Sequence, residues 1–312
     1  MNPKITSCIK AGFHITRKSS AGVGIYITGL VAIFILSAIA LLPTKPPFQS
    51  WAAIAKNRAK IEQQSTLSRN TQSAADKSKP HKVTPEEKEV FDWLKKAWPA
   101  VVLLTIFLIL GIYFLEAGKI WFLAKKIRED QAGLADFLAA GWKLFWPLIT
   151  ASILSISVLL LPILLCVGLA SLSFAIMPHG LAGILAFFAV MAVIVFLVWL
   201  GVRLYFLGIA VVADQKSPIE AWKSSFHATL GRWWPVLGFG IVLWLLSVGA
   251  DIVMNMTKVI LAFVAGKAVG LLVIVLGFVV KIFISFLNTG AAIYYYDETK
   301  KIGEAVSGSN PI

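Results

Sequence analysis

Long apolar stretches separated by short polar segments dominate the pattern along the chain. A helix needs about 20 apolar residues to cross a bilayer. Six stretches meet this length: Gly22–Leu42, Pro99–Ala117, Trp146–Ile176, Leu181–Val212, Pro235–Met254 and Val259–Tyr294. The third, fourth and sixth exceed a straight crossing, so they must tilt, kink or extend into the interface. The pattern predicts an all-α integral membrane protein whose six transmembrane helices form three hairpins.

Amphipathic segments precede these hairpins and predict helices that lie at the membrane surface. One such segment ends the hydrophilic stretch 43–98, where helical spacing groups Val90, Phe91, Leu94 and Trp98 on one side. We expect four regions. Residues 1–42 form an N-terminal amphipathic segment with the first span, and residues 43–98 form a hydrophilic, partly flexible loop that ends in an amphipathic helix. Residues 99–300 form a five-span bundle, and residues 301–312 form a short tail. The first span is long for a cleaved signal peptide, which favours a retained anchor.

Composition excludes a water-soluble protein. Of the 312 residues, 58% are hydrophobic and 14% are charged, whereas soluble domains are about 45–50% apolar and about 25% charged. The net charge of +13 would suggest phosphate contacts in a nucleic-acid binder. Here the basic residues lie between apolar stretches, so we expect membrane orientation and contact with anionic lipid headgroups, and no nucleic acid.

Lysine and arginine collect on one side of the predicted spans. They lie before the first span, between the second and third, between the fourth and fifth, and after the sixth, whereas the opposite short connections hold only Lys258 and Lys267. The positive-inside rule then places both termini in the cytoplasm, in a multi-pass protein of the cell inner membrane. The lysine-rich stretch 43–98 is the exception, because it would lie outside.

Short motifs recur before the spans. Trp-Pro occurs at Trp98-Pro99, Trp146-Pro147 and Trp234-Pro235, and Lys10-x-x-Phe13-His14-x-Thr16 is echoed by Lys223-x-x-Phe226-His227-x-Thr229. Tryptophan favours the headgroup level, and proline is tolerated in the first helical turn, so each pair fits the point where a surface helix gives way to a span. The motifs indicate three copies of one unit, or an interface that repeatedly selects the same residue types.

The C-terminal third of the chain resembles a known family. The resemblance rests on Arg203-Leu204, Ala210-Val211-Val212-Ala213, the segment 217–225 with its P-x-x-A-x-x-x-S pattern, Gly231-Arg232-Trp233-Trp234, and the closing Ala291-Ala292-Ile293-Tyr294-Tyr295-Tyr296-Asp297. This pattern is similar to the membrane domain of glycerophosphoryl diester phosphodiesterases and its stand-alone six-span bacterial relatives. The resemblance implies fold and location, because the phosphodiesterase chemistry of that family belongs to a separate soluble barrel that these residues do not match.

Ionisable residues inside the apolar stretches give a candidate polar site. Charged groups in lipid are costly and usually face the bundle interior or water. The candidate intramembrane site consists of Glu116, Arg203, Lys281, Ser285 and Asn288. Lys281, Ser285 and Asn288 share one helix face, and we expect Glu116 to pair with Arg203 in the cytoplasmic half, with Lys281 nearby. The alternative is snorkelling or structural pairing of these charges.

Catalytic and metal-binding motifs do not emerge from the sequence. The four histidines and two cysteines lack metal-ligand spacing, and no phosphate-cradling glycine loop occurs. We therefore expect no enzyme activity, no cofactor and no metal. The leading hypothesis is a scaffold, assembly factor or lipid-interacting protein, and the alternative is a transporter or lipid-handling channel with a polar site around Arg203 and Lys281. A membrane enzyme acting on lipid phosphates is a third class.

A ladder of small residues begins the sixth predicted span. Its members, Ala262, Gly266 and Gly270, would let two helices approach closely. This ladder predicts either packing within one chain or a homo-oligomer contact.

Overall fold

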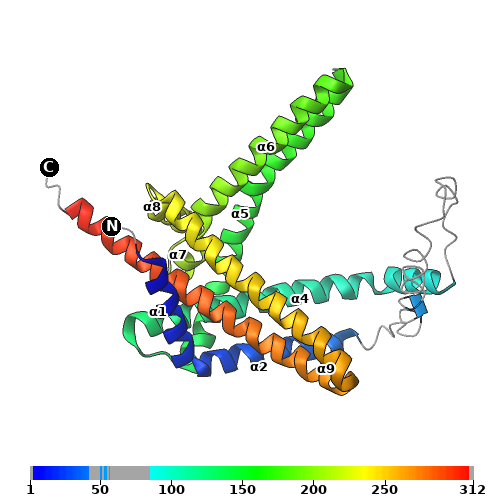
Figure 1. Ribbon diagram of the computed structural model, residues 1–312, viewed down its shortest axis with the longest axis horizontal. Helices are drawn as coiled ribbons and strands as arrows, with labels where there is room; N and C mark the ends of the chain where they lie inside the picture. Colours follow the sequence, from blue (N-terminus) through cyan, green and yellow to red (C-terminus); the bar gives the residue numbers. More distant parts are fainter. Residues whose placement is uncertain are drawn as a thin grey trace. The chain divides into compact units, whose positions relative to one another are not determined.

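A computed structural model describes residues 3–41, 50, 53–54, 56, 85–176 and 178–308. Most of the stretch 43–98 and the last four residues lie outside this part, as do the side chains of Leu94 and of the Ala262-Gly266-Gly270 ladder. Throughout the described ranges the regular structure is helical, and no strand occurs. The helices are α1 (Ile5–Lys18), α2 (Ser20–Leu41), α4 (Pro85–Glu129), α5 (Leu134–Ile176), α6 (His179–Leu204), α7 (Leu207–Ala213), α8 (Pro218–Thr229) and α9 (Trp233–Gly308) (Figure 1).

Six helical segments are long and apolar enough to cross a membrane. They are Ser20–Ser37, Lys95–Glu129, Leu134–Ile176, Gly180–Ala213, Trp233–Thr257 and Leu276–Ile302. The predicted all-α integral membrane fold is therefore confirmed. The last of these segments covers the part of the predicted sixth stretch, and its continuation to Ile302, whose side chains the structure describes.

The chain forms two compact units. One contains Leu30–Gly111, and the other combines Met1–Gly29 with Ile112–Ile312. Within the first unit, Ser50 donates a hydrogen bond to Glu89. The second unit contains α1, α5–α9 and the adjoining ends of α2 and α4, and it holds every residue of the candidate site.

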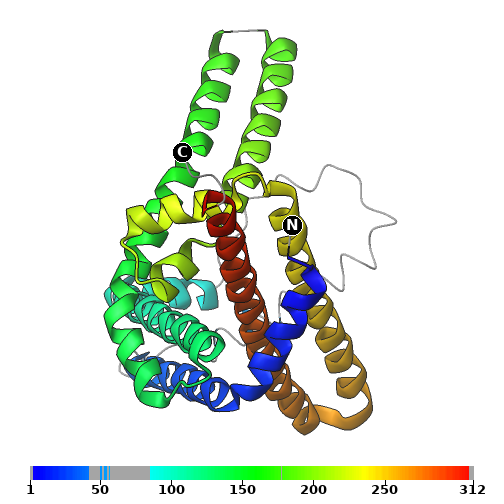
Figure 2. The same cartoon turned by 90° about the vertical axis from the view of Figure 1, so that its left-hand side faces the viewer.

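Helix α9 folds back on itself to form the third hairpin. Asn288 Nδ2 donates to Ser247 Oγ at 2.8 Å, whereas a straight helix would separate residues this far apart in the chain by about 60 Å. The first arm, Trp233–Thr257, and the second arm, Leu276–Ile302, therefore run antiparallel. Figure 2 shows this reversal, and it shows α5 and α6 side by side as another hairpin.

The second arm of α9 is the central helix of its unit. In this arm 44% of the span is buried, against 6–17% for the other five. Tyr295 stacks on Phe239 of the first arm at 4.6 Å between ring centroids, and on Phe206 before α7 at 5.8 Å. The end of the tyrosine run that closes the apolar sequence, Tyr295 and Tyr296, thus belongs to the core.

Two short helices, α1 and α8, bury stripes of small side chains at matching positions. The buried residues, at four-residue spacing in each helix, are Cys8, Gly12 and Thr16 in α1, and Ala221, Ser225 and Thr229 in α8. The sequence echo between the two helices aligns these positions pairwise. The equal placement of the small residues supports an internal repeat, because both helices use the same face for close packing.

The Trp-Pro pairs do not all mark a helix boundary. Pro99 and Pro147 lie inside the continuous helices α4 and α5. The chain breaks before Trp234-Pro235 instead, where Gly231 has a φ of +69°. Proline bends a helix without always ending it, whereas a residue with positive φ between two helices redirects the chain, a conformation that glycine adopts without strain.

The crossing of α1 over the second arm of α9 gives a first prediction. A Cβ atom at Gly12 would lie 2.7 Å from the Leu287 carbonyl oxygen and 2.9 Å from Ala291 Cβ. We expect Gly12→Ala to lower the free energy of unfolding by about 1–3 kcal/mol, because backbone atoms cannot move aside cheaply. Equilibrium unfolding in mixed micelles and hydrogen exchange across α1 measure the effect.

Gly24→Ala is the matched control for this prediction. A Cβ atom at Gly24 meets nothing within 4 Å, and alanine favours a helix over glycine by about 1 kcal/mol. We expect this variant to be as stable as the wild type or slightly more stable. A Gly12→Ala variant that behaved like Gly24→Ala would contradict the close crossing.

Candidate functional site

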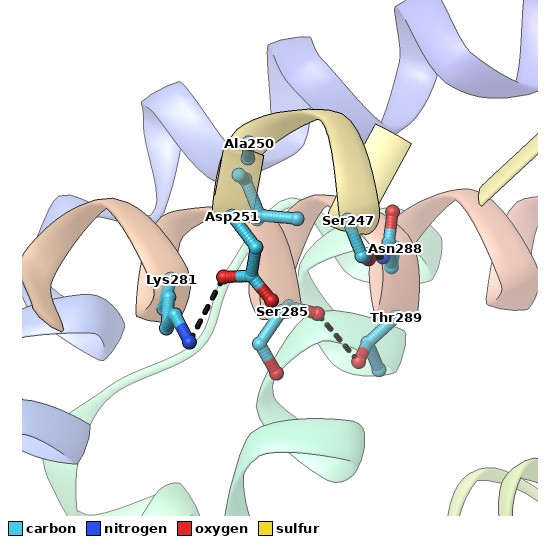
Figure 3. A pocket seen from close by; sticks show the side chains of 8 residues that line it. Ser247, Ala250, Asp251, Lys281, Ser285, Asn288 and Thr289 are labelled. Atoms are coloured by element: carbon cyan, nitrogen blue, oxygen red, sulfur yellow. Dashed lines mark hydrogen bonds and ion pairs between the residues drawn. The ribbon is translucent and has the colours of Figure 1, made fainter. Parts of the chain in front are cut away.

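A polar pocket of about 340 Å³ lies between the two arms of α9. Figure 3 shows its polar side chains, which are Ser247, Asp251, Lys281, Ser285, Asn288 and Thr289. Three of the five residues in the predicted site, Lys281, Ser285 and Asn288, therefore line one pocket. Their four- and seven-residue spacing places them on the same face of the second arm.

An ion pair between the two arms forms the open side of this pocket. Lys281 Nζ lies 2.9 Å from Asp251 Oδ1, and the two side chains are 58% and 46% exposed. Lys258 and Lys267 follow Asp251 along the chain, but their side chains lie outside the described residues. Because α9 folds back on itself, its second arm brings Lys281 beside Asp251.

Lys281 and Asp297 lie far apart along the second arm of α9. Sixteen residues separate the two, which corresponds to about 24 Å of helix. The hydrocarbon core is about 30 Å thick. Lys281 and Asp297 are therefore separated by most of the thickness of a hydrocarbon core.

A second polar group contacts the pocket through Ser285. Lys119 Nζ of α4 donates to Ser285 Oγ at 2.9 Å and lies 2.6 Å from Glu116 Oε2. Tyr26 of α2 donates to Glu116 Oε1 at 2.5 Å. Lys119 is 2% exposed, so these partners take the place of water around its ammonium group. We call Tyr26, Glu116, Lys119 and Ser285 the buried network.

Sequence reasoning placed Lys119 among the cytoplasmic charges and missed its burial. The useful signal was its position three residues after Glu116, which puts both side chains on one face of a helix. Tyr26 gave no signal, because nothing in the sequence specifies which helix faces α4.

Arg203 lies apart from this site. Its Nη1 donates to Thr229 Oγ1 at 3.2 Å and to the Phe226 carbonyl at 3.3 Å. The guanidinium also lies 5.5 Å from the Trp199 ring centroid. The predicted Glu116–Arg203 pair is wrong: Glu116 is bound by Tyr26 and Lys119, and Arg203 instead holds α8 against α6, in line with the alternative of structural pairing.

A cluster of charges joins the ends of three helices. Arg128 of α4 lies 2.6 Å from Asp297 Oδ1 of α9 and 3.1 Å from Asp214 Oδ1 after α7, and it donates to the Ala213 carbonyl at 2.8 Å. Lys300 Nζ adds a contact with Asp214 at 3.1 Å. We call Arg128, Asp214, Asp297 and Lys300 the ionic clasp. It links the last parts of the three hairpins, and no sequence motif indicated it.

The carboxyl group of Asp214 is held ionised in the clasp. Burial acts to raise its pKa, but the hydrogen bonds from Lys300 and Tyr296 and the charge of Arg128 outweigh burial and lower the pKa below its ordinary value of 3.8. A lowered carboxyl pKa stabilises the fold fully above the unfolded value and loses this contribution as pH falls through the folded value. The Asp214 contacts therefore keep their full strength from neutral pH down to about pH 4.

Comparison with known proteins gives no assignment: no family model, no curated protein and no solved structure matches this chain. Among the described residues, no group of three or more His, Cys, Asp or Glu side chains is arranged to hold a metal ion. The functional argument therefore rests on the α9 pocket, the buried network and the ionic clasp.

Proposed function

We propose that this polytopic membrane protein is a non-catalytic, lipid-interacting protein of the bacterial inner membrane, with both termini in the cytoplasm. Its task is to hold a phospholipid headgroup in the α9 pocket. The observation that carries this proposal is the half-exposed Asp251–Lys281 ion pair within two apolar spans.

Exposed charges in an apolar span require a polar partner. An aspartate or lysine at the centre of a spanning helix costs about 2.5–3.5 kcal/mol on insertion scales. Asp251 and Lys281 reduce this cost by pairing, yet about half of each side chain remains open. We take the pair to lie near one boundary of the core, because about 24 Å of helix separates Lys281 from Asp297, and lipid headgroups supply polar groups and charges at such a boundary.

The rest of the unit supports the pocket as a scaffold. The buried network fixes α4 and α2 to the second arm behind Ser285. The ionic clasp fixes the far end of the same arm through Arg128 and Asp297. A binding pocket is most effective when its walls are held by packing and by hydrogen bonds outside the site.

Polar side chains along the second arm favour one alternative, a transporter or lipid-handling channel. Lys281, Ser285, Asn288 and Tyr296 follow one another over most of the span. Three of them are engaged by Lys119, Ser247 and Asp214, an arrangement that favours a static binding site over a path for solute.

Native mass spectrometry of the purified protein tests the proposal. We expect the double variant Asp251→Asn, Lys281→Gln to retain several-fold less co-purified phospholipid than the wild type. The matched control is Lys126→Gln, Asp130→Asn, which removes another ion pair, at the end of α4, and should retain lipid as the wild type does. Equal lipid retention in all three proteins would overturn the proposal.

Reconstitution into liposomes separates binding from transport. With a fluorescent phospholipid and dithionite added outside, a binding protein leaves the inner-leaflet fluorescence intact. Accelerated loss of this fluorescence that requires Asp251 and Lys281 would replace the binding function with the lipid-handling alternative.

A further inference from the structure

We infer that the headgroup held in the α9 pocket is zwitterionic, with a phosphate and a primary ammonium, as in an aminophospholipid. This inference rests on the proposed function and specifies its ligand class. It follows from the arrangement of opposite charges in the pocket and from the apolar surface beside it.

The charges of the pocket cancel. Asp251 and Lys281 are its only ionisable lining residues among those described, and Ser247, Ser285, Asn288 and Thr289 add neutral hydroxyl and amide groups. The group behind Ser285 is also neutral in sum, because Lys119 is paired with Glu116. A headgroup that carries only a negative charge would be attracted by Lys281 but repelled by the carboxylate of Asp251, because these two side chains lie within ion-pair distance of each other.

A dipolar headgroup satisfies both open charges. Its phosphate can accept hydrogen bonds from Lys281, which has three donors, and its ammonium can donate to the second oxygen of Asp251. Because Asp251 and Lys281 are adjacent, at 2.9 Å, the ligand's two charges must also be close together. A phosphate and an amine joined by a two-carbon linker meet this requirement.

The hydrogen-bond chemistry favours a primary over a quaternary ammonium. A carboxylate accepts hydrogen bonds, and a primary ammonium offers three donors. A trimethylated ammonium has none, so it leaves the open oxygen of Asp251 with only a Coulomb interaction across three methyl groups. We therefore expect ethanolamine-type headgroups to bind better than choline-type headgroups.

The surface around the pocket fits the rest of a lipid. Ile252 and Val253 on the first arm are 54% and 62% exposed, and Leu276 and Val279 on the second arm are 55% and 38% exposed. These side chains lie within five residues of Asp251 or Lys281 on the same two arms, and the apolar residues Ala250 and Ile284 line the pocket itself. An amphiphile can place its headgroup in the pocket and its acyl chains along these residues.

Lipid titration of the delipidated full chain tests this inference. Phosphatidylethanolamine, phosphatidylcholine and phosphatidylglycerol with identical acyl chains are added, and the bound fraction is measured by native mass spectrometry. We expect phosphatidylethanolamine to bind about tenfold more tightly than the other two, the effect of about one charge-assisted hydrogen bond. Asp251→Asn should abolish the preference over phosphatidylglycerol, because the repelling charge is gone.

The outcomes separate this inference from the proposed function. Tighter binding of phosphatidylglycerol that is lost in Lys281→Gln would overturn the zwitterionic ligand, and tighter binding of phosphatidylcholine that is lost in this variant would overturn the primary ammonium. Either result would leave a headgroup site. Equal binding of all three lipids, unchanged in Asp251→Asn and Lys281→Gln, would overturn both. The variant Lys126→Gln, Asp130→Asn again serves as the ion-pair control, and the thermal unfolding of each variant verifies that it is folded.

Discussion

Replacing Lys119 by methionine is expected to lower the free energy of unfolding by about 2–4 kcal/mol, somewhat less than breaking a fully buried ion pair from one side, because the Glu116 side chain is 32% exposed. Lys119 is 2% exposed and contacts Glu116 at 2.6 Å and Ser285 at 2.9 Å. Its loss leaves the carboxylate of Glu116 in the membrane with only the hydrogen bond from Tyr26. Equilibrium unfolding in mixed micelles, followed by tryptophan fluorescence, measures the loss.

The double variant Glu116→Gln, Lys119→Met provides the control for this prediction. It removes both charges and keeps a side chain that can accept from Tyr26, so we expect most of the lost stability to return. Lys126→Met removes a lysine at the α4 end and should change stability by less than about 1 kcal/mol. A double variant as unstable as Lys119→Met alone would contradict the buried network.

Replacing Arg128 by alanine is expected to cost about 2–4 kcal/mol. Arg128 is 34% exposed, so its contribution lies between that of a surface ion pair and that of a buried one. Without it, Asp214 and Asp297 lose their shared partner and the Ala213 carbonyl loses a donor. We expect hydrogen exchange to rise in α7 and in the last turns of α9, which the clasp joins.

Arg128→Lys is the informative companion variant. Lysine keeps the charge but cannot reach both carboxylates and the carbonyl with one planar group. It should recover only part of the stability lost in Arg128→Ala. A Lys301→Ala variant removes an exposed ion pair with Glu298 and should be near neutral. If Arg128→Ala were no worse than Lys301→Ala, the ionic clasp would not hold the three hairpins.

The membrane fold could be predicted from the sequence because bilayer thickness fixes the length of an apolar helix. Stretches such as Trp146–Ile176 and Leu181–Val212 fall inside the observed spans Leu134–Ile176 and Gly180–Ala213. The role of the closing tyrosines could not be predicted, because Tyr295 and Tyr296 resemble interfacial residues in sequence, whereas in the structure they are buried in the core.

Helical periodicity predicted only which residues of the candidate site share a helix face. Lys281, Ser285 and Asn288 share one face because of their spacing, and they line one pocket. The partners of these residues depend on which helices become neighbours, and spacing along one helix carries no such information. For the same reason Glu116 was assigned to Arg203, although Lys119, one turn away on the same helix, was the nearer cation.

The most direct test of the account is the structure of the protein in nanodiscs that contain phosphatidylethanolamine, determined by electron cryo-microscopy with a bound antibody fragment. The account predicts headgroup density within hydrogen-bond distance of Lys281 Nζ and Asp251, with acyl chains along Ile252 and Val279. Density for protein side chains that cover the ion pair, with no lipid headgroup beside it, would contradict the proposed lipid site.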